Sequence, residues 1–199
     1  MKSILYTSLY FLALMNPVSK IFILSTLANE LSLKERKIVV IKSSIIAFLI
    51  LFVFILTQDI IFTKIFKINL YSLKIAGGII LTYIGFKAIN KGIFFETSAN
   101  NKLVDISIVP LASPMIAGPA TITACIIYSK DIGLKITFFS IVIAIIINLF
   151  IMVLSDYISK FLLKYNLMGA LIRITGLIVM AMAIQMISSG LIDLIKIIK

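Results

Sequence analysis

The chain has 199 residues, of which 61% are hydrophobic, and its mean hydropathy is +1.18. Soluble domains are about 45–50% apolar, so this composition excludes an ordinary soluble fold and makes a lipid bilayer the expected partner. The net charge of +11 comes from lysines that lie mostly between apolar segments and at their ends, where they can contact anionic headgroups. Nucleic-acid binding is therefore not expected.

Six apolar segments are long enough to span a bilayer, which takes about 20 residues in a helix. They are continuous and lack the alternation of a membrane barrel, which favours helices. The segments are Ile4–Leu27, Ile38–Thr57, Leu70–Ile89, Ile106–Tyr128, Leu134–Leu154 and Leu167–Gly190. We predict an all-α polytopic membrane protein with six transmembrane helices, which form a single membrane domain over residues 1–199.

The first segment is interrupted by Asn16-Pro17. The break lies about 13 residues into the span, or roughly 20 Å at 1.5 Å per residue, slightly past the bilayer centre. Proline frees backbone groups that need partners in the membrane, and Asn16 offers both a donor and an acceptor. A half-helix starting at Pro17 would present a partly positive end there, with Ser19 close by. Lys20 either contacts a substrate or counter-ion, or snorkels to an interface or solvated lumen.

The first connection, residues 33–37, holds the densest basic cluster, with Lys34, Arg36 and Lys37. Early positive charges often decide the orientation of insertion. We therefore predict a multi-pass protein of the cell (inner) membrane. Its first connection is expected to be cytoplasmic, and both termini periplasmic or extracellular.

The fourth segment carries a stronger interruption than the first. Three prolines, at 110, 114 and 119, fall within ten residues, and Gly118 adds backbone freedom. A second half-helix is predicted to start near Pro119, with Thr121 in its first turn. Two such ends that enter from opposite sides can form a polar pocket for a carboxylate. The alternative is that these prolines only kink their helices. The predicted substrate-binding residues are Asn16, Pro17, Ser19, Ser113, Pro114, Gly118, Pro119 and Thr121.

The two halves of the chain carry similar helix interruptions and motifs at matching positions. The proline sites are 97 residues apart (17 and 114), and the motifs that begin Lys74-Ile75 and Arg173-Ile174 are 99 residues apart. Three spans leave the chain on the opposite side of the membrane, so a repeated three-helix unit must be inverted. We predict two inverted repeats with broken first and fourth helices: residues 1–90 and 103–199, joined by a linker over 91–102.

Other polar groups within the spans are few. Asn148 and Gln185 are secondary site candidates, together with Lys20, although hydrogen bonding between helices explains both uncharged residues equally well. The chain has no histidine and a single cysteine, Cys125, and no acidic residue lies at mid-span. We therefore expect no metal, no cofactor and no enzymatic activity.

Small residues recur along two of the segments. Gly78, Thr82 and Gly85 share one face of the third, and Gly176, Ala183 and Gly190 recur along the sixth. Such faces allow helix backbones to approach closely. We expect them to be packing surfaces.

Several motifs, in order along nearly the whole chain, resemble the MarC family. They are Asn16-Pro17, the run Lys74 to Ile80, the run Val109-Pro110-Leu111-Ala112-Ser113-Pro114-Met115-Ile116-Ala117-Gly118-Pro119, and the stretch from Gly176 through Gln185 to Gly190. The chain departs from the family pattern Asn-Pro-x-Gly-x-x-Pro, since Ser19 replaces the glycine and Phe22 the second proline. The resemblance implies a six-helix inner-membrane protein, grouped with LysE-type amino-acid exporters and classed by some with neutral amino-acid transporters.

The residues and the resemblance together favour a secondary transporter of a small solute such as a neutral amino acid. An ion or solute gradient would drive it, because the sequence has no ATP-binding loop, and a coupling ion is a possible further partner. A channel for small polar solutes and a non-transporting membrane factor are the alternatives. The sequence leaves the oligomeric state open.

Overall fold

The computed structural model describes residues 2–27, 31–57, 60–65, 67–93, 112 and 116–198. Within these ranges every regular element is helical, which confirms the predicted all-α class. The α-helices are α1 (Lys2–Met15), α2 (Pro17–Thr26), α3 (Leu33–Thr57), α4 (Leu70–Lys91), α6 (Pro119–Asp131), α7 (Leu134–Val153), α8 (Ser155–Lys164) and α9 (Met168–Ile198), and a π-helix, η2, covers Ile60–Ile65.

Five stretches of the described chain are long and apolar enough to cross a membrane. They are Ser3–Ser25, Leu33–Thr57, Leu70–Lys91, Leu134–Val153 and Met168–Ile198. Each corresponds to a predicted segment, and the first contains the predicted interruption between α1 and α2. Much of the predicted fourth segment, including Ser113 and Pro114, lies outside the described residues, as does most of the predicted linker.

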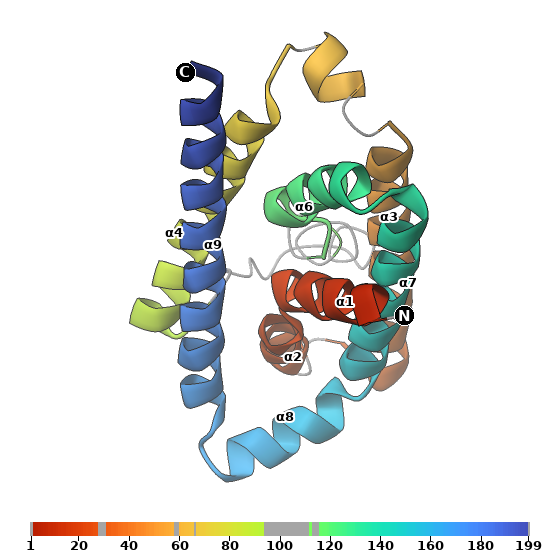
Figure 1. Cartoon of the computed structure of the whole chain (residues 1–199). Helices are drawn as coiled ribbons and strands as arrows, with labels where there is room; N and C mark the ends of the chain where they lie inside the picture. The colour runs from red at the N-terminus through yellow and green to blue at the C-terminus, as the bar shows by residue number, and fades with distance from the viewer. Residues whose placement is uncertain are drawn as a thin grey trace.

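The helices run in two directions (Figure 1). The long helices α3, α4, α7 and α9 run roughly from top to bottom of the view, whereas α1 and α6 run across it. Helix α3 packs on α7, α4 packs on α9, and α1 and α6 contact each other and α7. Helix α8 lies at one end of the molecule, and the C-terminus lies at the other. Helices α1, α2 and α6 lie between the α4–α9 pair and the α3–α7 pair.

Glycines allow the backbones of α4 and α9 to pack in direct contact. A Cβ atom on Gly78 would lie 2.8 Å from the carbonyl oxygen of Ala183, and one on Gly190 would lie 2.9 Å from that of Tyr71. Real Cβ atoms essentially never approach this closely. The predicted packing role of the small-residue faces is confirmed.

Two features of the fold were not predicted. Helix α3 begins five residues before the predicted span, because Ser32 and Glu35 form a capping box: the Ser32 amide donates to Glu35 Oε2 at 2.9 Å, and the Glu35 amide donates to Ser32 Oγ at 3.3 Å. Between α7 and α9, α8 is an amphipathic helix that buries Ser155, Ser159 and Leu162. An ion pair between Arg36 of α3 and Asp156 of α8 joins these two regions.

The surface of the long helices is apolar. Ile45 on α3, Ile146 on α7 and Ile178 on α9 are all exposed, as are many other large aliphatic side chains. Exposed apolar area of this extent is expected only where lipid replaces water. The buried core, which includes Phe11, Leu51 and Ile141, lies inside this shell.

Candidate functional site

The break between α1 and α2 is built around Asn16. Its backbone is left-handed (φ 49°, ψ 76°) and its side chain accepts a hydrogen bond from the Ser19 amide at 3.3 Å. Pro17 follows at the first helical position, where its fixed φ and missing N–H are tolerated. Ser19 is buried, and its hydroxyl donates to the Asn16 carbonyl at 2.7 Å. Asn16 is thus the N-cap of α2, a role that uses its side-chain acceptor.

The Lys20 side chain also lies at the break between α1 and α2. The side chain is fully buried, and its ammonium donates to the carbonyls of Met15 and Asn16. Met15 is the last residue of α1, so its carbonyl lies beyond the intrahelical bonds of that helix, whereas the Asn16 carbonyl belongs to the N-cap of α2 and also accepts from Ser19 Oγ. The snorkelling interpretation is therefore wrong for this structure: the charge is turned inward, toward the partly negative end of α1.

The second predicted break lies at the start of α6. Gly118 is the N-cap, with extended backbone, and Pro119 is at the first helical position. Thr121 is buried in the first turn. One turn of α6 faces α4, since a Cβ on Gly77 would lie 3.3 Å from Thr123 Oγ1.

Among the described residues of the predicted site, the members from the first break, Asn16, Ser19 and Lys20, contact one another. Among the described helices, α2 packs on α7, α8 and α9, whereas α6 packs on α1, α3, α4 and α7. The binding role of the two breaks stays a prediction.

Asn148 lies in the interior of α7. It is fully buried, its Nδ2 lies 3.2 Å from the sulfur of Met152, and its Oδ1 has no hydrogen-bond partner in the described part of the chain. Gln185, in contrast, is exposed on α9 and faces a cavity.

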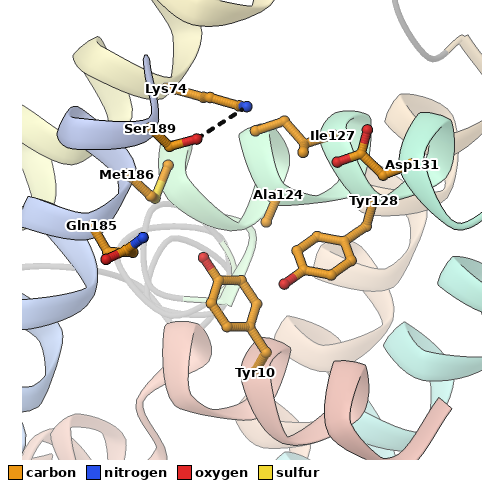
Figure 2. Close-up of a pocket in the computed structure, with 9 residues that line it drawn as sticks. All are labelled: Tyr10, Lys74, Ala124, Ile127, Tyr128, Asp131, Gln185, Met186 and Ser189. Carbon is orange, nitrogen blue, oxygen red and sulfur yellow. Dashed lines mark hydrogen bonds between the residues drawn. The ribbon is translucent and has the colours of Figure 1, made fainter. Parts of the chain in front are cut away.

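That cavity has a volume of about 250 Å³ and lies between four helices. Figure 2 shows the nine residues that line it: Tyr10 from α1, Lys74 from α4, Ala124, Ile127, Tyr128 and Asp131 from α6, and Gln185, Met186 and Ser189 from α9. The rings of Tyr10 and Tyr128 are 5.2 Å apart, and their hydroxyl groups point toward the space between α1, α6 and α9 (Figure 2).

The cavity contains charges of both signs. Lys74 donates to Asp193 at 2.6 Å and to Ser189 at 3.3 Å. Because an ammonium has three N–H donors, one remains for a further acceptor. Asp131 is exposed at the end of α6, on another wall of the cavity (Figure 2). The lining therefore carries one ammonium and one carboxylate.

Of the predicted site residues that the structure describes, Gln185 alone lines this cavity. Lys74 was noted only as part of a repeated motif. Asp131 falls between the predicted fourth and fifth spans, where no motif singles it out. Tyr10 and Tyr128 were missed because aromatic residues are ordinary in membrane helices. One signal was present: tyrosine in an otherwise aliphatic span carries a hydroxyl that needs a polar environment.

No set of three His, Cys, Asp or Glu residues that could hold a metal ion occurs among the residues that the structure describes. Cys125, the single cysteine, is buried in α6.

Helices of membrane-spanning length, an apolar outer surface and a polar cavity enclosed by helices define a polytopic integral membrane protein. The MarC family integral membrane protein description matches residues 1–195, and the chain belongs to this family. The resemblance noted in the sequence is thus confirmed.

Relatives in archaea and bacteria cover nearly the whole chain. A UPF0056 membrane protein of Pyrococcus horikoshii is 33% identical over 190 residues, which is 96% of this chain and 94% of the relative. A UPF0056 membrane protein of Methanocaldococcus jannaschii is 35% identical, with 90% and 91% covered, and one of Bacillus subtilis is 33% identical, with 90% and 89% covered. No solved structure matches the chain.

Proposed function

We propose that this protein is a secondary transporter of a small zwitterionic solute, with neutral amino acids as the expected class. The observation that carries the proposal is the cavity of about 250 Å³, which has an ammonium and a carboxylate in its lining. Pockets for drug-sized ligands are about 300–1,000 Å³, so this volume suits a smaller solute. The proposed role is binding and movement of the solute, without catalysis.

The charges of the lining complement those of an amino acid. Asp131 would bind the α-ammonium, and the free N–H of Lys74 would bind the α-carboxylate beside Asp193. The Tyr10 and Tyr128 hydroxyls, together with the Gln185 amide, offer neutral hydrogen bonds to the same solute. A solute without a positive charge would give Asp131 no partner, which disfavours it.

We also propose the six-helix architecture of two inverted repeats, over residues 1–90 and 103–199. Two pairs of corresponding elements pack on each other: α3 with α7, and α4 with α9. The members of each pair run in opposite directions (Figure 1). Both features are expected for repeats related by a two-fold axis in the membrane plane.

In this arrangement the cavity lies between the repeats. The first repeat contributes Tyr10 and Lys74, and the second contributes the remaining lining residues. Thr121 precedes Ala124 of the lining by about one turn of α6. Movement of the joined α4–α9 pair against α1 and α6 would expose the solute to alternate sides. We place the protein in the inner membrane with Arg36 at the cytoplasmic end and both termini outside.

Uptake of labelled glycine, alanine and serine into proteoliposomes, with and without a pH or sodium gradient, tests the proposal. Asp131→Asn removes the proposed ammonium partner. Glu35→Gln is the matched control, because it removes the same charge from an exposed side chain outside the cavity and keeps a capping acceptor for Ser32. Loss of a charged hydrogen bond costs about 1.5–3 kcal/mol, so we expect about a tenfold or larger rise in KM for Asp131→Asn.

Each outcome has a distinct meaning. Saturable uptake that Asp131→Asn impairs and Glu35→Gln leaves intact supports the transporter. Flux that does not saturate and shows no exchange indicates a channel. Absence of flux under every gradient, with folded protein, contradicts transport of amino acids and favours a non-transporting role.

A further inference from the structure

The buried ammonium of Lys20 occupies an unusual position in the fold. It lies at the junction of α1 and α2 and binds the carbonyls of Met15 and Asn16, with no side-chain carboxylate paired to it in the described part of the chain. The carbonyl of Asn16 also accepts from Ser19 Oγ. Two carbonyl oxygens, one from the end of α1 and one from the N-cap of α2, thus accept hydrogen bonds from a single positive charge.

Burial of an isolated charge is costly unless its hydrogen bonds are satisfied. Within a membrane protein such charges are rare and usually face a functional interior. In transporters with broken helices, unwound carbonyls and half-helix C-terminal ends are the groups that coordinate a sodium ion. Here the same kind of groups bind an ammonium that the chain itself supplies.

We propose that the Lys20 ammonium takes the place of a coupling monovalent cation at the α1–α2 break, so that the protein binds its solute without sodium. This inference rests on the proposed transport function. Asn16 and Lys20 then act together as positioning residues: one starts α2, and the other fills the cation position where α1 ends.

Two variants separate this role from simple packing. Lys20→Ala removes the ammonium and leaves space beside the freed carbonyls. Lys20→Met keeps most of the stem and removes only the charge, so that no space for a cation opens. Each purified protein is heated in detergent with sodium chloride, potassium chloride or n-propylammonium chloride, which matches the deleted atoms beyond Cβ. Tetramethylammonium chloride at equal ionic strength is the reference, because it has no N–H donor.

For Lys20→Ala we expect a lower melting temperature than for the wild type, with an upward shift by n-propylammonium or an alkali cation that saturates with concentration. The wild type and Lys20→Met should not distinguish among the cations. An equal response of Lys20→Ala to all four salts would overturn the proposal, since the carbonyls would then not form a cation site.

Flux provides the second measurement, and its wild-type part alone can contradict the proposal. Wild-type uptake should be the same in sodium as in N-methylglucamine buffer, whereas uptake by Lys20→Ala should become sodium-dependent. Saturable sodium dependence of the wild type contradicts the proposal even if Lys20→Ala does not fold. If no protein transports any solute, the proposed function fails, while the melting experiment still decides whether the break binds a cation.

Discussion

Gly85 of α4 and Gly176 of α9 meet across the helix interface with their backbones in contact. A Cβ on Gly85 would lie 2.8 Å from the Gly176 carbonyl oxygen, and one on Gly176 would lie 2.8 Å from the Cβ of Ala88. Without a hydrophobic driving force in lipid, close backbone packing of this kind is a main source of helix association.

Gly176→Ala should therefore separate α4 from α9. Overpacking costs about 1–3 kcal/mol, and thermal unfolding in detergent should show a lower midpoint. Gly169→Ala is the matched control, because it lies on the same helix and its Cβ would meet only Arg173 Nη1, at 3.9 Å. An unchanged midpoint for Gly176→Ala would contradict the backbone contact.

Asn16→Ala and Asn16→Gly separate the structural role of Asn16 from a binding role. Alanine loses the cap, which costs about 1 kcal/mol, and must adopt the left-handed backbone, which costs about 1–2 kcal/mol more. Glycine accepts that backbone and costs only a few tenths of a kcal/mol at an N-cap. Thermal unfolding should therefore rank Asn16→Ala well below Asn16→Gly.

A functional role for the Asn16 amide predicts a different pattern. Both variants lack the amide, so both would lose solute uptake to the same degree. Uptake that follows stability instead would limit Asn16 to its capping role.

The Arg36–Asp156 ion pair should contribute to stability, because both side chains are largely shielded from solvent. Asp156→Asn leaves the Arg36 charge without its partner, which should cost about 1–3 kcal/mol. A double-mutant cycle with Arg36→Gln measures the coupling. Additive effects of the two substitutions would show that the pair is not coupled. Lys160→Gln, an exposed change on the same helix, controls for the loss of a charge.

Cysteine labelling tests the proposed topology. Cys125 is buried, so an impermeant maleimide should modify it only after denaturation. In a Cys125→Ala background, Lys34→Cys and Lys160→Cys should label from one side, and Lys67→Cys and Lys135→Cys from the other, since all four positions are exposed. Labelling of Lys34→Cys and Lys160→Cys from opposite sides would refute the six-span arrangement.

Local chemistry in the sequence predicted the membrane class, the positions of the five spans that the structure describes and the break at Asn16-Pro17. Apolar run length and proline each act within a few residues, so they can be read without knowledge of the fold. Helix α8 was missed because a ten-residue amphipathic segment between spans has no length signal, and the start of α3 was missed because the Ser32–Glu35 capping box was overlooked.

The cavity could not be predicted in the same way. Tyr10, Lys74 and Asp131 come from three helices, and only the packing of those helices brings them to one space. Lys20 shows the same limit: the sequence placed a charge within the span, but whether its side chain turns toward an interface or back toward α1 depends on the geometry of the break.

The glycine contacts between α4 and α9 have a consequence for selectivity. One wall of the cavity, with Lys74 and Gln185, belongs to this tightly joined pair, and the facing wall belongs to α1 and α6. A stiff pair moves as one body. The width of the cavity therefore depends on how the α4–α9 pair packs against α1 and α6, and little on the rotamers of individual lining side chains. Discrimination among solutes by size would then be tuned by substitutions at the docking surface, far from any residue that touches the solute.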